Sequence, residues 1–222
     1  MYDNITVQGI VLDTSLVKEY DKRIVLLTVE LGRITVFANG ARRKNSQFTA
    51  VCQKFVMGEF VIRPGSQNSY SLVNATISDN FINLSYDIEK LAYASYACEL
   101  VGYFTHEGVR AKDELNLLYV TFKAILNEKP SLAVIKSVLE CKLMDIEGIV
   151  SVEALHESYK PHNITEDTDY IIRYILSRKI NELYSFDVSD RISDELDKVI
   201  TKYLNKECDR HFKSLDILKP LL

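Results

Sequence analysis

Residues 23–38 have the sequence RIVLLTVELGRITVFA. Two runs rich in β-branched and aliphatic residues, 23–29 and 33–38, stand on either side of the short connection Glu30-Leu31-Gly32. Such runs are typical of strands, and a short connection that contains glycine suits a hairpin. The stretch therefore predicts two paired strands, and the sequence on both sides of it extends the β pattern.

The rest of residues 1–80 also predicts short strands. They are expected at 5–12, at 54–56 together with 59–63, at 70–73 and at 75–77, and Pro64-Gly65 ends the run at 59–63. A series of short strands within one such segment indicates a small barrel or sandwich. A closed barrel leaves no strand edge unpaired, which allows a β domain of this size to be soluble.

From residue 88 onward the apolar residues recur at helical spacing. Asp87 is expected to cap the first helix, and Gly108 lies where that helix is expected to end. Further helices are predicted at 113–127, from the cap Ser131 toward Gly148, at 169–183 and at 193–209. Residues 149–167 are left open between strands, a loop and a short helix near 152–158.

This change of period sets the expected domain organisation. We predict an α+β protein with an all-β domain at residues 1–80 and an all-α helical domain at residues 81–222. The length of 222 residues suits one large or two modest domains. With 47% hydrophobic and 26% charged residues, the chain has the composition of an ordinary globular protein with a sizeable core.

The sequence argues against membrane attachment and secretion. It contains no run of about 18 uncharged apolar residues, the minimum for a membrane span. Its first residues, Met1-Tyr2-Asp3-Asn4, lack the basic region and apolar stretch of a secretory signal. We therefore expect a cytoplasmic protein.

The cysteines and the known catalytic motifs point away from metal sites and enzymes. The four cysteines, at 52, 98, 141 and 208, are widely spaced and form no Cys-x-x-Cys pair. Zinc sites usually draw on close pairs, and disulfide scaffolds belong to small secreted chains. The sequence also has no P-loop, Gly-x-Ser-x-Gly elbow or His-Glu-x-x-His motif. We expect reduced, mostly buried thiols, no metal or other cofactor, and no catalytic centre.

Charge is distributed unevenly along the chain. The net charge is −4, yet residues 1–80 hold nine Lys and Arg against seven Asp and Glu, and residues 31–58 contain no acidic side chain. Gly40 permits an unusual turn, and three consecutive cations follow it on a polar loop. Positive side chains that reach outward from a loop suit phosphate groups. These cations either contact the phosphates of DNA or only keep the loop soluble, and the sequence leaves both readings open. The candidates for DNA contact are Lys22, Arg23, Arg33, Arg42, Arg43, Lys44 and Lys54.

Aromatic residues and lysines supply the remaining candidate binding groups. Phenylalanines interleave with the cations of the β domain, at Phe37, Phe48, Phe55 and Phe60. Their rings either stack on unpaired bases or fill the barrel, and the sequence leaves both readings open. In the helical domain, lysines at the border of a groove between helices would suit a short apolar and acidic peptide. The candidates are Lys123, Lys136 and Lys142.

A series of short motifs follows in order along the chain. The main ones are Gly9-Ile10-Val11-Leu12, Tyr20-Asp21-Lys22-Arg23, Leu31-Gly32-Arg33, Gly40-Ala41-Arg42-Arg43, Gly58-Glu59-Phe60, Glu140-Cys141-Lys142-Leu143 and Lys213-Ser214-Leu215. In sequence and spacing, this series resembles the RecO family of recombination-repair mediators. The resemblance covers nearly the whole chain apart from about 149–190.

The resemblance implies an N-terminal OB-fold barrel, a helical domain and a function without catalysis. It implies that the protein binds single- and double-stranded DNA and anneals strands in the bacterial cytoplasm, at the nucleoid. It further implies work with RecR, contact with the acidic C-terminal tail of single-stranded-DNA-binding protein, and help in loading RecA. The alternative is a non-catalytic adaptor whose OB-like barrel binds a protein partner.

One segment departs from the family. Many relatives carry two Cys-x-x-Cys pairs after the segment that matches 140–148, and these pairs form a zinc-binding subdomain. Residues 149–167 of this chain contain no cysteine. We therefore expect the helical domain to lack that subdomain and to be stable without zinc.

Overall fold

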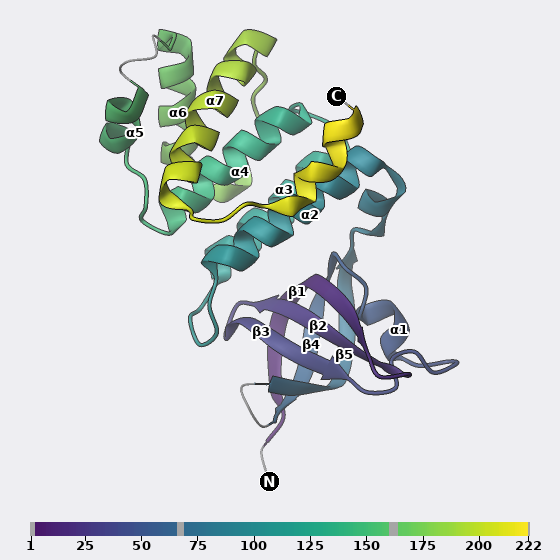
Figure 1. Cartoon of the computed structure of the whole chain (residues 1–222). Helices are drawn as coiled ribbons and strands as arrows, with labels where there is room; N and C mark the ends of the chain where they lie inside the picture. Colours follow the sequence, from purple (N-terminus) through teal and green to yellow (C-terminus); the bar gives the residue numbers. More distant parts are fainter. Residues whose placement is uncertain (1–2, 66–68, 160–163, 222) are drawn as a thin grey trace. The chain divides into compact units, whose positions relative to one another are not determined.

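The computed structural model describes residues 3–65, 69–159 and 164–221 (Figure 1). The chain divides into two compact units. The first unit comprises Met1–Tyr86 and Gly102–Leu115, and the second comprises Asp87–Val101 and Asn116–Leu222. The first is mainly β structure and the second is helical, which confirms the predicted fold class of a barrel followed by helices.

The strands of the first unit close into an OB-fold barrel. They are β1 (Ile5–Val17), β2 (Asp21–Thr28), β3 (Gly32–Ala38), β4 (Val56–Pro64) and β5 (Ser69–Asn80). Their order around the barrel is β1-β2-β3-β5-β4, and β4 pairs with β1 to close it. The seam between β3 and β5 is parallel and the other pairs are antiparallel. The predicted hairpin is β2–β3, whereas the two runs predicted at 70–73 and 75–77 are parts of the single strand β5.

Strand β1 pairs with two strands, β4 and β2, because it bends along its length. Its first half pairs with β4 and its second half with β2, with a register shift between Val11 and Asp13. A bulge of this kind bends a strand and increases its twist. It explains why β1 runs on to Val17, beyond the strand predicted at 5–12.

Two glycines face each other where β1 and β4 pair. Gly9 lies opposite Gly58 in the ladder. A Cβ atom on Gly58 would lie 2.1 Å from the carbonyl oxygen of Thr76, and one on Gly9 would lie 2.7 Å from that of Leu27. Both positions therefore require glycine, because a neighbouring backbone approaches too closely for any side chain.

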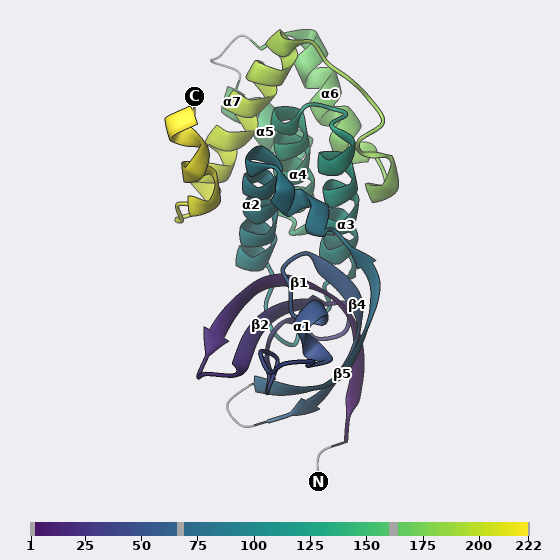
Figure 2. The same cartoon turned by 90° about the vertical axis from the view of Figure 1, so that its right-hand side faces the viewer.

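Alternate residues of the strands form the barrel core. In β3, Ile34, Val36 and Ala38 are buried, while the residues between them are partly exposed. The short helix α1 (Phe48–Val51) lies across one end of the barrel in Figure 2, and its Val51 belongs to the same core cluster. The sequence did not predict α1, because four residues are too few to show a helical period.

A segment from the middle of the chain completes the first unit. The turn between β2 and β3 accepts two backbone hydrogen bonds from it: Gly108 N–H to Leu31 O, 2.9 Å, and Ala111 N–H to Val29 O, 3.2 Å. Gly32, at the start of β3, has a φ of +66° and would place a Cβ 2.1 Å from the carbonyl oxygen of His106. The residues 102–115 are thus fastened along this turn by main-chain contacts.

The second unit is a helical bundle. Its helices are α2 (Ile88–Phe104), α3 (Lys112–Asn127), α4 (Leu132–Ile146), α5 (Val152–Tyr159), α6 (Glu166–Ser177) and α7 (Asp190–Glu207). The last residues of α2 and the first residues of α3 are counted with the first unit. Asp87 caps α2 as predicted, since its carboxylate accepts from the backbone N–H groups of Glu89 and Lys90. Ser131 caps α4, also as predicted.

Several predicted helix limits were wrong. The helix predicted at 169–183 ends at Ser177, and the short 3-10 turn η3 (Ile180–Glu182) follows it. Helix α2 ends at Phe104, before Gly108, and α7 begins at Asp190 rather than at residue 193. The segment left open at 149–167 contains α5. Local interactions at helix ends, which a hydrophobic period does not report, set these limits.

The C-terminal segment packs on α2 within the second unit. The carboxylate of Glu99 accepts hydrogen bonds from the backbone N–H of Ser214, 3.1 Å, and from its hydroxyl, 2.8 Å. The ring of Phe212 meets that of Tyr96 edge-on, with 5.8 Å between centroids. The 3-10 segment η4 (Lys213–Leu221) then runs beside α2 (Figure 1, yellow).

Candidate nucleic-acid interface

The basic loop that follows β3 is held against the turn between β1 and β2. Gly40, with a φ of +70°, donates its N–H to the carboxylate of Asp21 at 2.8 Å. The N–H of Arg42 donates to the carbonyl oxygen of Tyr20 at 3.0 Å. These contacts fix the backbone of the loop, so the cations that follow Gly40 start from a defined position.

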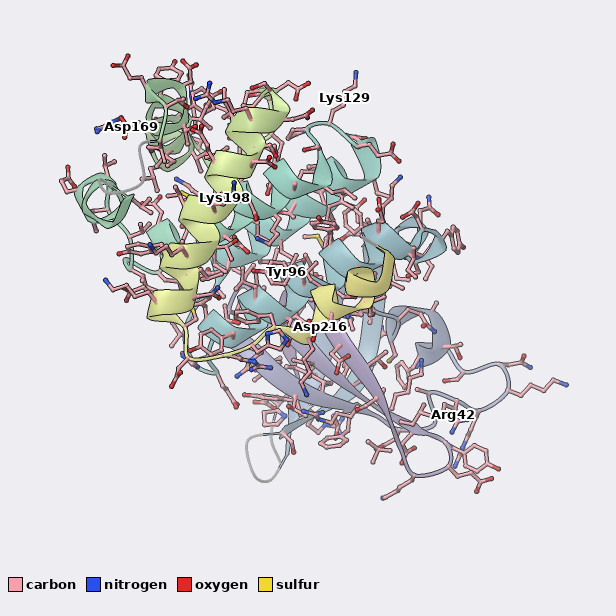
Figure 3. The ribbon with its side chains drawn as sticks, turned by 45° about the horizontal axis from the view of Figure 1, so that its top comes forward. Arg42, Tyr96, Lys129, Asp169, Lys198 and Asp216 are labelled. Atoms are coloured by element: carbon pink, nitrogen blue, oxygen red, sulfur yellow. The ribbon has the colours of Figure 1, made fainter. Side chains whose placement is uncertain are left out.

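The three consecutive cations Arg42, Arg43 and Lys44 are exposed. The guanidinium of Arg42 donates to the carbonyl oxygen of Glu19 at 2.8 Å, and that of Arg43 lies 5.8 Å from the ring centroid of Tyr20. Figure 3 shows Arg42 on this loop. Within the described residues, no carboxylate forms an ion pair with any of the three, so their charge is available to an external anion.

Two further predicted DNA-binding residues lie beside the loop. Lys22 and Arg23 begin β2 directly after the turn that holds it, and both are partly exposed. Arg23 pairs across the ladder with Phe37, on the outer side of the barrel. Burial raises the pKa of the Cys52 thiol to about 11, and the charge of Lys22 opposes that rise. Lys22 is therefore near the segment that joins α1 to β4.

The remaining two predicted DNA-binding residues lie elsewhere on the barrel. Lys54 precedes β4, and its ammonium group lies 5.3 Å from the ring centroid of Phe55. Arg33 stands at the opposite end of β3 from the basic loop, next to the backbone of Gly102. At about 3.3 Å per residue, the five-residue step from Arg33 to Ala38 is roughly 16 Å. The structure thus gathers five of the seven residues at one end of β2 and β3.

The aromatic residues separate into core and surface. Phe60 belongs to the buried core of the barrel, Phe48 packs partly against that core, and Phe55 is fully buried as well, so these rings contribute to the interior of the protein. Phe37 is partly exposed on the outer side. Tyr20, which sequence reasoning did not single out, is 45% exposed beneath Arg43. Tyr20 could have been predicted as a binding residue from the sequence, because it directly precedes Asp21-Lys22-Arg23, two of which were predicted to contact DNA.

The three lysines predicted to bind a partner have different surroundings. Lys136 forms ion pairs with Glu140 and Asp197, and Lys142 pairs with Asp145 and donates to the carbonyl oxygen of Leu176. Both side chains are largely buried. Lys123 is exposed, lies over the ring of Tyr119 at 4.4 Å, and borders a groove of about 240 Å³ that Lys129 also lines. Partner binding by these lysines stays a prediction.

Other classes of site find little support in the described parts of the chain. All four cysteines are buried, as expected, and burial raises the pKa values of Cys52 and Cys141. No group of three or more His, Cys, Asp or Glu side chains in these parts is arranged to hold a metal ion. Nor is any described helix long and apolar enough to span a bilayer.

Comparison with known proteins gives one consistent family. The family model described as recombination protein O N terminal matches residues 1–81, and the one described as recombination protein O C terminal matches residues 85–151. A DNA repair protein RecO of Alkaliphilus metalliredigens is 28% identical, with 98% of this chain and 99% of the relative covered. One of Clostridium kluyveri is 26% identical, covering 97% and 93%. The chain therefore belongs to the RecO family.

Proposed function

We propose that this protein is a non-catalytic mediator of recombination repair that binds DNA through the basic loop of its barrel. The observation that carries the proposal is the loop itself. Three adjacent cations are exposed, their backbone is fixed by the contacts of Gly40 and Arg42, and none of them has a carboxylate partner among the described residues. Such a loop suits a nucleic-acid backbone, because each nucleotide carries one negative phosphate and the exposed cations can reach phosphates in different positions.

Aromatic rings beside the loop favour single strands. Tyr20 and Phe37 both have exposed ring surface next to cations, at Arg43 and Arg23. Unpaired bases stack on such rings whatever their sequence, whereas the bases of a duplex are already stacked on each other. The same surface would hold duplex DNA through phosphates alone, so binding would be less tight but not absent.

The family assigns the mediator further partners, and the helical unit is where we place them. In this proposal the protein anneals complementary strands, acts with RecR, and helps to load RecA onto DNA covered by single-stranded-DNA-binding protein. The acidic tail of that protein would bind the helical unit. Of the three predicted lysines, Lys123 is the one that borders an open groove, together with Lys129, so it is the first to test.

An adaptor function is the competing proposal, and one observation favours it. Leu16, near the end of β1, and Tyr20, in the turn under the basic loop, are 64% and 45% exposed. An apolar surface next to cations also suits an acidic protein segment. The two proposals separate on whether the loop is needed for DNA or only for a protein partner.

The test is fluorescence anisotropy of a labelled single-stranded oligonucleotide at several salt concentrations. We expect the triple variant Arg42→Ala, Arg43→Ala, Lys44→Ala to bind more weakly and to lower the magnitude of the log–log salt slope by about 2, at roughly 0.7 for each phosphate that the variant leaves unneutralised. The control removes three exposed lysines from α7: Lys198→Ala, Lys202→Ala, Lys206→Ala. Wild-type protein that fails to bind even at low salt, or loop and control variants that bind alike, would favour the adaptor.

A further inference from the structure

A second surface that combines cations with aromatic rings lies in the helical unit. It is an open groove of about 570 Å³ formed by α6 and the turn that follows it. The residues that matter for its chemistry are Tyr170, Arg173, Tyr174, Arg178, Lys179 and Glu182. None of them was among the predicted binding residues, and all lie beyond residue 151, where the match to the family model ends.

The two tyrosines of the groove share one face of α6. Tyr170 and Tyr174 are four residues apart, which places their side chains about 6 Å apart along the helix axis. Tyr174 is fixed, because its ring meets that of Phe186 edge-on at 5.3 Å and Arg178 lies 4.5 Å above it. Tyr170 is 66% exposed, so most of its ring is open to a ligand.

The groove is positive inside an acidic part of the chain. Its lining has three cations against one carboxylate, whereas residues 81–222 hold 18 Lys and Arg against 24 Asp and Glu. Arg178 pairs with Glu182 at 3.5 Å and Arg173 with Asp169 at 2.8 Å, both at the surface. Figure 3 labels Asp169 on α6. Exposed ion pairs contribute little, so a phosphate can compete for either arginine.

Lys179 adds a positive charge to the groove that no carboxylate of the described residues neutralises in an ion pair. It is exposed, and within the described residues no carboxylate forms an ion pair with it. It follows Arg178 directly, so two adjacent cations lie at the end of α6, close to the face that carries the tyrosines. Positive side chains beside a platform of rings are the arrangement that holds unpaired nucleotides.

We propose that this groove is a second binding site for single-stranded nucleic acid. A base stacks on the exposed ring of Tyr170, while Arg173, Arg178 and Lys179 contact the adjoining phosphates. The volume falls within the range of roughly 300–1,000 Å³ that encloses small ligands, which suits one or two nucleotides. A duplex or an acidic peptide offers charge without a free base face, so neither would use the tyrosine. The inference uses no residue of the barrel and so goes beyond the proposed function.

The experiment isolates the groove in the full-length chain. The basic-loop triple variant serves as background, and the probe is a labelled oligothymidylate followed by anisotropy at low salt. We expect residual binding in this background, and Tyr170→Ala should weaken it by roughly 5- to 100-fold, the effect of losing one stacked base. Tyr170→Phe retains the ring and should bind like the background. Lys179→Ala should weaken binding and lower the salt slope, whereas Lys198→Ala on α7 should do neither.

The outcomes also separate this site from the barrel. Photocrosslinking with a 4-thiothymidine probe should label a peptide that contains Tyr170. Complete loss of binding in the loop variant, residual binding that Tyr170→Ala leaves unchanged, or equal affinity for an abasic strand would each overturn the proposal. If instead the loop variant binds like wild type and Tyr170→Ala still weakens binding, the barrel proposal fails while this one holds.

Discussion

The ammonium group of Lys136 lies 3.0 Å from a carboxylate oxygen of Glu140, one turn further along α4 and inside the helical unit. The same carboxylate accepts a hydrogen bond from the hydroxyl of Tyr96 on α2, whose pKa is raised by burial and by Glu140. Lys136 also donates to Asp197 and Thr201 on α7, both at 2.8 Å. One polar network around the buried carboxylate of Glu140 therefore joins three helices.

Removing Lys136 should destabilise the protein strongly. Lys136→Met leaves Glu140 buried without its ion-pair partner, and breaking a buried pair in this way costs about 3–5 kcal/mol. The free energy of unfolding from urea titrations at pH 7 measures the loss. Lys198→Met, at an exposed position of α7, should change it by less than about 0.5 kcal/mol. A loss below about 1 kcal/mol in Lys136→Met would show that water reaches Glu140.

The same variant should become more stable as the pH falls. Burial raises the pKa of Glu140 above its ordinary value of 4.5, and Lys136 opposes that rise. Without Lys136 the folded protein holds this proton more tightly than the unfolded chain does, so stability must decline as pH rises above about 4.5. The free energy of unfolding of Lys136→Met should differ more between pH 5 and pH 7 than that of the wild-type protein does. If this difference between the two pH values is the same in the variant and the wild type, Glu140 is not the group that takes up the proton.

Glu195 should contribute stability that is lost in acid. On α7, its carboxylate accepts from the N–H of Thr165, 3.0 Å, and from the hydroxyls of Thr165 and Thr168, both 2.7 Å. The N–H of Thr165 and the two hydroxyls lower its pKa to about 2. Because the folded pKa is depressed, this stability is complete above about pH 4.5 and disappears as the pH falls toward 2.

Glu195→Gln should therefore flatten the pH dependence of stability. We expect the free energy of unfolding at pH 7 to fall by about 1–3 kcal/mol, the effect of hydrogen bonds to a charged acceptor. The difference from wild type should shrink between pH 4.5 and pH 2. Glu166→Gln, exposed at the start of α6, is the matched control. If Glu195→Gln and Glu166→Gln change the free energy of unfolding and its pH dependence alike, the hydrogen bonds to Glu195 do not stabilise the fold in the way proposed.

Tyr20 should matter for single strands more than for duplexes. Tyr20→Ala removes a ring that lies beneath Arg43, and stacking on an aromatic ring contributes about 1–3 kcal/mol per base. The ratio of single-strand to duplex affinity should fall at least fivefold, while Tyr20→Phe should keep it. If the ratio does not change in Tyr20→Ala, the ring serves only to position Arg43.

Identical glycine substitutions should have opposite effects at two sites. Gly58→Ala drives a Cβ against the backbone of Thr76, which cannot move within the ladder, so we expect a loss of about 1–3 kcal/mol or failure to fold. At Gly102 in α2 the new Cβ meets Leu12 at 3.5 Å, an ordinary contact, and the helix gains up to about 1 kcal/mol from alanine. Thermal unfolding followed by circular dichroism compares the two. If Gly58→Ala left the stability unchanged, the ladder between β4 and β5, whose register shifts between Met57 and Gly58, would have to move to admit the methyl group.

The sequence predicted well the features that depend on a repeating pattern. The runs of β-branched and aliphatic residues predicted β2 and β3, and the helical period of the apolar residues from Ile88 onward predicted the helices. It also located the basic loop, since three consecutive cations after Gly40 need no tertiary information.

Features that depend on contacts between separate elements could not be predicted from the sequence. Lys136 and Lys142 look like surface lysines in the sequence, but both side chains are largely buried in the fold. Lys136 pairs with Glu140 one turn along α4 and also with the distant Asp197, and Lys142 pairs with the nearby Asp145. Helix α1 is too short to leave a pattern. The α6 groove depends on a turn that ends the helix at Ser177, where the apolar period alone predicted that it would continue.

The return of residues 102–115 to the barrel has a consequence for the order of synthesis. On the ribosome the five strands emerge first. The hydrogen bonds to the carbonyl groups of Val29 and Leu31 cannot form until their donors, the N–H groups of Ala111 and Gly108, have been synthesised. At roughly 5–20 residues per second, the last strand precedes Leu115 by about 2–7 s. During that interval the nascent barrel is unfinished, and the chain must pass through Asp87–Val101, which belongs to the other unit, before it can be completed. Neither unit is therefore a contiguous product of translation.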